Sequence, residues 1–215
     1  MSNVTSCSSW RLYVIIDKAA AGGRDLAWIA DQAIQGGADV IQLRDKAAST
    51  RAMIEEASRI AHVAYVARVP FLINDRVEVA VAVGADGVHI GQDDLPVSVV
   101  RQILGSAPMI GKSTHSLAQA LEAEREEAGY IAVGPVYPTP TKPDSPAVGL
   151  DLIGQVKGRV QRPIVAIGGI DHSTLPDVLS AGATCVAVVR AVSGADDPQA
   201  AARALKAILL QIAPT

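Results

Sequence analysis

Eight short apolar runs recur along this chain at roughly regular intervals, and nearly all of them end in a polar or glycine cluster. The runs cover residues 12–16, 40–43, 71–73, 88–90, 109–110, 131–133, 164–167 and 185–189. Continuously apolar runs are typical of parallel strands that are covered on both faces. They predict an α/β fold, a single (β/α)8 TIM barrel, in which the C-terminal ends of the strands meet at one face and carry the active site.

The segments between the runs have the composition of helices, with many alanines and apolar residues at three-to-four spacing. They cover residues 25–35, 50–67, 76–83, 97–104, 117–127, 150–158, 173–181 and 198–212. Side chains that cap helix N-termini stand near the start of four of them, at Asp25, Ser49, Ser116 and Ser173. Strand and helix therefore alternate throughout, as parallel β-α-β crossovers require.

The length of 215 residues suits one barrel near the lower end of its size range. We therefore predict one catalytic barrel domain over residues 11–215. Residues 1–10 are rich in serine and lack both the basic start and the apolar segment of a secretory signal. We expect them to form a flexible N-terminal tail.

Composition excludes several classes of partner. Aromatic residues make up 3% of the chain and the net charge is −3, so we expect no nucleic acid partner. No apolar run reaches the roughly 18 residues of a membrane span, and no membrane contact is expected. With two cysteines a disulfide framework is improbable, which favours the cytoplasm. The oligomeric state stays open, a homo-oligomer included.

A long segment after the sixth run, residues 134–149, has the sequence GPVYPTPTKPDSPAVG. Its prolines forbid a helix and disfavour a paired strand. Loops of this length in a compact domain are usually functional or disordered. Because the loop leaves the catalytic face and contains Thr139, Thr141 and Lys142, we favour a mobile lid over a solvated linker.

Gln42, Arg44 and Lys46 follow one another at every second position near the end of the second run. Period-two alternation places all three on one side of a strand. A planar guanidinium and a compact ammonium together suit phosphate oxygens. The alternative is an exposed group of charges in which Arg44 pairs with Asp45.

Two pairs of polar residues follow the third and fourth runs, Asn74-Asp75 and Asp93-Asp94. One carboxylate from each of two neighbouring loops is a typical arrangement for Mg²⁺, which keeps several waters and also binds ligand phosphates. Helix capping is the alternative. Asp94 precedes Leu95-Pro96 as an N-cap residue often does, and Asp75 precedes the helix expected near Arg76.

The fifth run is followed by the sequence GKSTH, residues 111–115, in which a hydroxyl is available to a ligand. Ser113 is also compatible with a simple strand end, and His115 with a helix cap. His89 lies between Val88 and Ile90, and we interpret it as a hydrogen-bonded packing residue.

Glycines and a cation follow the last two runs, as Gly168-Gly169 and Val189-Arg190. Barrels of this type frequently bind phosphate between these two loops through backbone N–H groups. A plain tight turn is the alternative. A second phosphate site, separate from the one near Arg44, suggests two phosphorylated substrates.

Taken in order, the motifs QLRDK, INDR, DGVHIGQDD, a Ser-Thr-His sequence, VGPVYPTPTK, IGGI and VAVVRA resemble those of the thiamine phosphate synthase family over residues 12–205. The resemblance implies a transferase that joins 4-amino-2-methyl-5-hydroxymethylpyrimidine diphosphate to a thiazole phosphate and releases pyrophosphate. A thiazole phosphate carboxylate also loses carbon dioxide. The resemblance further implies a dissociative mechanism assisted by Mg²⁺ as the cofactor.

The resemblance also implies roles for individual residues. Asp75 and Asp94 are the expected magnesium ligands, and the expected catalytic residues are Arg44, Lys46, Ser113 and Lys142. Residues expected to contact the pyrimidine diphosphate are Gln42, Arg44, Lys46, Asn74, Ser113 and Lys142, with the backbone of Leu43 and Asp45. Those expected to contact the thiazole phosphate are Thr139, Pro140, Thr141, Gly169, Val189 and Arg190.

Two positions depart from the family pattern. Arg190 stands where many relatives carry serine, so a backbone contact is expected there rather than a defined side-chain contact, and Lys112 has no assigned family role. The main alternative function is that of the thiazole tautomerases, barrels of similar sequence that need neither diphosphate nor metal. A catalytically silent barrel that binds a phosphorylated ligand is the other alternative. Retention of Asp75, Asp94, Lys46 and Lys142 together argues against the tautomerase, and the complete sets of ligand-binding residues argue against the silent barrel.

Overall fold

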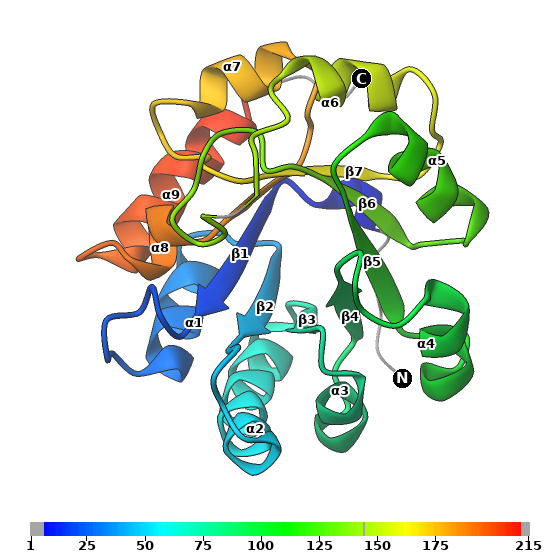
Figure 1. Ribbon diagram of the computed structural model, residues 1–215. Helices are drawn as coiled ribbons and strands as arrows, with labels where there is room; N and C mark the ends of the chain where they lie inside the picture. The colour runs from blue at the N-terminus through cyan, green and yellow to red at the C-terminus, as the bar shows by residue number, and fades with distance from the viewer. Residues whose placement is uncertain (1–6, 144, 212–215) are drawn as a thin grey trace.

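The computed structural model describes residues 7–143 and 145–211, and in this part of the chain eight parallel strands close into a barrel in chain order (Figure 1). The strands are β1 (Leu12–Asp17), β2 (Val40–Arg44), β3 (Phe71–Asn74), β4 (Gly87–Ile90), β5 (Met109–Thr114), β6 (Tyr130–Val133), β7 (Ile164–Ile167) and β8 (Val186–Val188). The ring is closed by β8, which pairs with β1 in a register that aligns Leu12 with Val186. The predicted (β/α)8 barrel is therefore confirmed.

Helices surround the barrel on its outside (Figure 1). They are α1 (Leu26–Gln35), α2 (Thr50–Ala67), α3 (Val77–Val83), α4 (Val97–Leu104), α5 (Leu117–Arg125), α6 (Asp151–Lys157), α7 (Leu175–Ser180), α8 (Arg190–Ser193) and α9 (Pro198–Leu209). All but α8 match a predicted helix; with 4 residues, α8 is too short to show a periodic pattern. Among the described helices, none is both long and apolar enough to cross a membrane.

Two apolar layers hold the barrel together. One lies between strands and helices and includes Val14 and Ile41. The other fills the barrel and includes Tyr13 and Ile15. Since successive side chains of a strand point to opposite faces, residues 12–16 of β1 are buried in the two layers alternately. This explains why the strands are continuously apolar in sequence.

The residues before β1 pack into the N-terminal end of the barrel. Trp10 is 2% exposed, and its ring makes edge-on contacts with Tyr13 and Tyr130 at centroid distances of 5.9 and 5.7 Å. Cys7 lies in the short 3-10 helix η1 (Cys7–Ser9), where its thiol donates to the Gly129 carbonyl at 3.3 Å. The predicted flexible tail is therefore wrong for residues 7–10, because burying a large aromatic ring outweighs the polar serines around it. Residues 1–6 of that prediction lie outside the described residues.

Strand β5 extends well beyond its apolar run. The run covers 109–110, but the strand continues to Thr114, and Lys112 and Ser113 are buried within it. These polar groups tolerate burial because they find partners. The Thr114 hydroxyl donates to the Ala132 carbonyl at 3.0 Å, and the Lys112 ammonium donates to the Gly91 carbonyl at 2.8 Å. The expectation that residues 111–114 follow the strand is therefore wrong.

Three of the four predicted N-caps are confirmed. Asp25, Ser49 and Ser116 each accept a backbone N–H from the first turn of α1, α2 and α5 respectively. Ser173 does not cap α7, whose first turn begins after Thr174. Its hydroxyl donates instead to Asp171 at 2.6 Å, because that carboxylate organises the turn before the helix.

Candidate active site

A pocket of about 440 Å³ opens at the C-terminal ends of the strands. Most of the residues predicted to bind ligands line it: Gln42, Arg44, Asn74, Ser113, Thr139, Pro140, Thr141, Lys142, Gly169, Val189 and Arg190. Leu43, Asp45, Lys46, Asp75 and Asp94 are not among its lining residues. Leu43 is wholly buried in the outer apolar layer, so only its backbone can face a ligand. The Asp45 carboxylate accepts the N–H groups of Ala47 and Ala48 in a turn.

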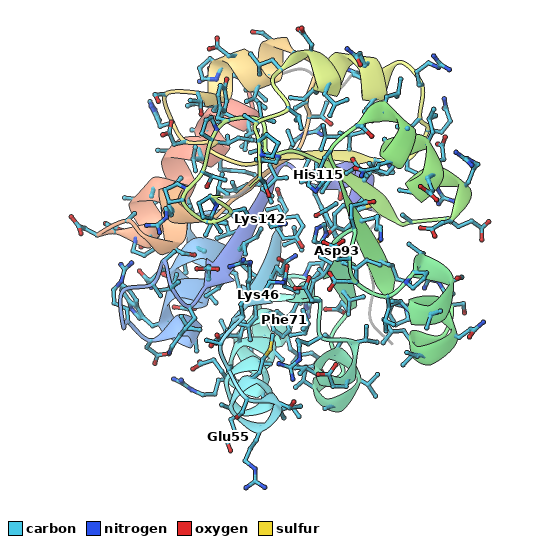
Figure 2. The ribbon with its side chains drawn as sticks, viewed as in Figure 1. Lys46, Glu55, Phe71, Asp93, His115 and Lys142 are labelled. Atoms are coloured by element: carbon cyan, nitrogen blue, oxygen red, sulfur yellow. The ribbon has the colours of Figure 1, made fainter. Side chains whose placement is uncertain are left out.

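Cationic side chains gather at one side of the pocket. Arg44 pairs with the buried carboxylate of Asp17, not with Asp45 as the alternative interpretation had it. Lys46 pairs with Asp75. Figure 2 shows Lys46 and Lys142 over the same end of the barrel, with Asp93 and His115 around them. Partial burial lowers the pKa of Lys142, and the positive charge of Arg44 lowers it further.

The two predicted metal ligands approach each other beside Lys46. Asp75 directly follows β3 with φ 61, a left-handed conformation that is uncommon outside glycine, and its N–H donates to the His89 carbonyl at 2.8 Å. Asp94 accepts the N–H of Gly91 at 2.6 Å. Burial raises the pKa of Asp94, and the hydrogen bond and charge of Asp75 raise it as well.

Neither aspartate caps a helix. The N-cap positions of α3 and α4 are Arg76 and Pro96, and neither makes a side-chain cap bond. Over residues 7–143 and 145–211, no group of three or more His, Cys, Asp or Glu side chains is arranged to hold a metal ion. Two carboxylates side by side nevertheless fit Mg²⁺, which needs only one or two carboxylates when phosphate and water complete its shell.

A chain of five polar side chains crosses the barrel beneath the pocket. Gln42 Nε2 donates to the Tyr13 hydroxyl at 2.5 Å, which lies 3.0 Å from the hydroxyl of Tyr130. The Tyr130 hydroxyl lies 2.8 Å from His89 Nδ1, and His89 Nε2 lies 2.8 Å from Ser113 Oγ. We call these five residues the buried hydrogen-bond chain.

His89 is buried and hydrogen-bonded, as predicted, and it also lines the pocket. Burial lowers its pKa to about 3, and the positive charge of Lys142 contributes in the same direction. The imidazole is therefore neutral across the ordinary range of pH.

The glycines after β7 bring the long loop against the barrel. Gly168 and Gly169 have φ of 101° and 66°, and a Cβ on Gly168 would lie 2.4 Å from Pro135 Cα. A Cβ on Gly169 would lie 2.6 Å from Tyr137 Cβ. The N–H of Tyr137 donates to the Gly168 carbonyl at 3.0 Å. These positions therefore need glycine for close backbone approach, whatever ligand they meet.

Several functional residues escape sequence reasoning. In the sequence, Asp17, which pairs with Arg44, looks like the end of an apolar run. Tyr13 and Tyr130 look like core residues, and their hydroxyl groups are the one feature that indicates a polar role. His115 lines the pocket and its ring bonds to the Gly134 carbonyl at the start of the long loop, a contact that local sequence does not reveal.

Comparisons with known proteins confirm the predicted resemblance. A family model described as thiamine monophosphate synthase matches residues 12–192. The thiamine-phosphate synthase of Chloroflexus aurantiacus is 50% identical over 201 residues, with 93% of each chain covered. That of Shouchella clausii is 46% identical over 201 residues, covering 93% of this chain and 96% of the relative. The structure of thiamine phosphate pyrophosphorylase from Pyrococcus furiosus matches with a TM-score of 0.87 at 37% identity, over 94% of this chain and 96% of that one.

The fold and the pocket together define a TIM-barrel enzyme with its ligand site at the C-terminal ends of the strands. Within that class, the chain belongs to the thiamine monophosphate synthase family.

Proposed function

We propose that this protein condenses 4-amino-2-methyl-5-hydroxymethylpyrimidine diphosphate with a thiazole phosphate to give thiamine phosphate and pyrophosphate. The observation that carries the proposal is the gathering of Arg44, Lys46 and Lys142 with two carboxylates at one end of the barrel. Relatives that match almost the whole chain carry the name thiamine-phosphate synthase.

We assign the pyrimidine diphosphate to the β2 side of the pocket, where Gln42, Asn74 and Ser113 surround the cations. The lowered pKa of Lys142 supports this assignment, because a partly buried ammonium close to the positive charge of Arg44 favours the binding of a polyanion. A bound diphosphate is expected to reverse that shift. We assign the backbone of Leu43 and Asp45 to the same side, as further contacts of the pyrimidine diphosphate.

We assign the thiazole phosphate to the opposite side of the pocket. Gly169, Val189 and Arg190 lie there after β7 and β8, the usual place for a phosphate in these barrels. Thr139, Pro140 and Thr141 face the same pocket from the long loop. Arg190 is exposed at the start of α8, so its backbone N–H is the contact we propose.

Mg²⁺ is the metal we propose for Asp75 and Asp94. The raised pKa of Asp94, caused by burial and by the neighbouring Asp75, supports a divalent cation at this pair, which these two carboxylates would hold. When bound, the ion would neutralise negative charge on the departing pyrophosphate.

The residues of the pocket suit a dissociative reaction. The bond between the pyrimidine methylene and the diphosphate oxygen breaks, its electron pair leaves with the pyrophosphate, and the ring stabilises the resulting cation. The thiazole nitrogen then donates its lone pair to the methylene carbon. No protein nucleophile is needed, because Arg44, Lys46 and Lys142 act by stabilising the charge of the leaving group.

We further propose that residues 134–149 close over the pocket as a lid. Hydrogen bonds from Val136 and Tyr137 to the end of β7 fix the base of this loop, while Lys142 reaches the cationic side of the pocket from its middle. Closure would exclude water, which otherwise captures the carbocation.

An isomerase or a silent binding barrel has no use for this set of groups. Isomerisation of a thiazole transfers no diphosphate, so it explains neither the paired aspartates nor the three cations around them. The free, buried Cys7 and Cys185 favour a reducing compartment, and we propose the cytoplasm. Small molecules are the partners we propose.

The proposal is tested with purified protein, the pyrimidine diphosphate, a thiazole phosphate and Mg²⁺. We expect thiamine phosphate and pyrophosphate in equal amounts, and loss of both on addition of a chelator. Absence of product with both substrates present would refute the function. Undiminished turnover in the chelator would refute the metal role alone.

A further inference from the structure

The buried hydrogen-bond chain joins five strands and has both ends in the pocket. Tyr13, Gln42, His89, Ser113 and Tyr130 lie on β1, β2, β4, β5 and β6 respectively. Gln42 and Ser113 line the pocket and are 1% and 7% exposed. Tyr13 and Tyr130 lie below them and are not among the lining residues. The buried hydrogen-bond chain therefore links Gln42 and Ser113 through His89, which also lines the pocket, and through two tyrosines that do not.

The amide of Gln42 sets the direction of every proton in this chain. Its Nε2 is a donor only, so the Tyr13 hydroxyl accepts there. Within residues 7–143 and 145–211 the Tyr130 hydroxyl is the one acceptor left for the proton of Tyr13, so Tyr13 donates to Tyr130. The Tyr130 hydroxyl, having accepted, donates in turn to His89 Nδ1. Each hydroxyl thus donates once and accepts once.

His89 then has one possible arrangement. Because Nδ1 accepts a hydrogen bond, the neutral ring carries its proton on Nε2 and donates it to Ser113 Oγ. A protonated ring would leave the Tyr130 hydroxyl without an acceptor in this chain. Since Ser113 Oγ accepts from His89, its own proton is free to point into the pocket.

At the Gln42 end, the buried hydrogen-bond chain presents an acceptor and not a donor. Gln42 Oε1 is buried and has no hydrogen-bond partner within residues 7–143 and 145–211. Arg44 lines the same pocket, and its positive charge favours an amide oxygen over an amide NH₂ group on that side. Turning the amide over would reverse every hydrogen bond in the chain and convert Ser113 from a donor into an acceptor.

We propose that Tyr13, Tyr130 and His89 are positioning residues that hold His89 as its Nε2–H tautomer and thereby present the Ser113 hydroxyl to the ligand as a donor. The pocket then offers an acceptor at Gln42 and a donor at Ser113. It selects a ligand with a donor and an acceptor in the matching order, such as an amino group and a ring nitrogen or a phosphate oxygen. The identity of that ligand rests on the proposed function, but the tautomer does not.

The tautomer is measured on the ligand-free protein by two-bond ¹H–¹⁵N NMR of the histidine rings. His89→Gln identifies the His89 signals by their loss. We expect a protonated Nε2 and an unprotonated Nδ1 that accepts a hydrogen bond. A protonated Nδ1, or protons on both nitrogens, would overturn the proposal. This experiment needs no substrate, so its failure is distinct from failure of the proposed function.

Tyr130→Phe removes the hydroxyl that bonds His89 and keeps the ring. The ring fills space that Gly111 leaves open, since a Cβ there would lie 2.0 Å from Tyr130 Cζ. We expect the His89 signals to shift toward a mixture of tautomers, with little change in melting temperature. Tyr65→Phe on α2 is the matched control, because that residue is 83% exposed, and it should leave the His89 signals in place.

A double-mutant cycle on the condensation rate tests the role of Ser113. Tyr130→Phe should lower kcat about fivefold to tenfold, as expected for loss of one neutral hydrogen bond. In a Ser113→Ala background the same change should have little further effect. Equal losses in both backgrounds would show that Tyr130 does not act through Ser113 and would overturn the proposal.

Two amide variants supply a second measurement. His89→Gln places an amide near Nε2 and can still donate to Ser113, whereas His89→Asn places its amide near Nδ1. We expect His89→Gln to retain more activity than His89→Asn, with similar melting temperatures. The reverse order would contradict the assigned direction of the chain.

Discussion

At the scale of single residues, the three cations of the site differ in whether a carboxylate of the protein pairs with them. Asp17 compensates Arg44 and Asp75 compensates Lys46. Lys142 has no salt bridge within residues 7–143 and 145–211, and its pKa is lowered. Under the proposed function, this lysine is therefore the cation that would gain most from a bound diphosphate.

Lys142→Ala is expected to lower kcat about 100-fold or more, because it removes a charge that stabilises the leaving group. Stability should not fall, since partial burial and the charge of Arg44 both disfavour the Lys142 ammonium in the folded protein. Steady-state kinetics and a melting curve measure the two effects. Lys157→Ala on α6 is the control and should leave turnover unchanged. Full activity in Lys142→Ala would refute both its catalytic role and the proposed lid.

His89 also predicts a pH dependence of stability. Its folded pKa is about 3, below the ordinary value of 6.5, so the unfolded chain takes up the proton first as pH falls. The free energy of unfolding should therefore decrease as pH drops from about 6.5 towards about 3, by up to ~1.4 kcal/mol per pH unit.

Urea unfolding at a series of pH values, in a chelating buffer, measures this slope. His89→Gln should flatten the profile by about one proton. Asp94, Lys112 and Lys142 act on the same imidazole and are unchanged in that comparison. Identical slopes for the two proteins would show that His89 does not stay neutral.

At the scale of elements, the strand and helix pattern of the barrel is readable from sequence, because strands covered on both faces are apolar and the helices are periodic. The length of β5 and the N-cap of α7 differ from the prediction. Strand β5 continues beyond its two apolar residues because the Ser113 and Thr114 hydroxyls both find hydrogen-bond partners. Ser173 fails as a cap because Asp171, two residues earlier, organises the turn.

The long loop depends on the glycines after β7. Gly169→Ala must keep φ near 66° and place a Cβ 2.6 Å from Tyr137 Cβ. We expect a loss of about 2 to 3 kcal/mol in stability and a clear fall in turnover.

Gly84→Ala is the matched control, since Gly84 has φ 64° but no atom within 4 Å of the added Cβ. It should cost only the backbone strain, about 1 kcal/mol, and leave turnover intact. Denaturation curves and kinetics for the two variants separate strain from displacement of the loop. Equal effects would mean that contact with the loop is unimportant.

At the scale of the whole molecule, sequence motifs locate the residues at the strand ends better than the residues that lie inside the barrel beneath the pocket. Arg44 and Asn74 end their strands and Gly169 follows one, where a barrel carries its ligands, so the sequence pattern alone finds them. Tyr13 and Tyr130 lie inside the barrel, and their pairing across 117 positions depends on closure of the ring. No local pattern contains that information.

Binding at the rim should stabilise the entire barrel. Pyrophosphate with Mg²⁺, at about 100 times its dissociation constant, should add ~2.7 kcal/mol and raise the melting temperature by roughly 5 to 10 °C. Pyrophosphate in a chelator should give a smaller rise. A double substitution of Asp75 and Asp94 by asparagine should remove the difference between the two conditions, and a persisting difference would place the metal elsewhere.

The fit of Tyr130 against Gly111 also has an evolutionary consequence. Any side chain at position 111 would occupy the space of the aromatic ring. A descendant can therefore change this position only if the tyrosine is lost in the same step or before it. The two codons should covary among descendants of this gene, and a lineage that breaks the pair would need another way to orient its serine.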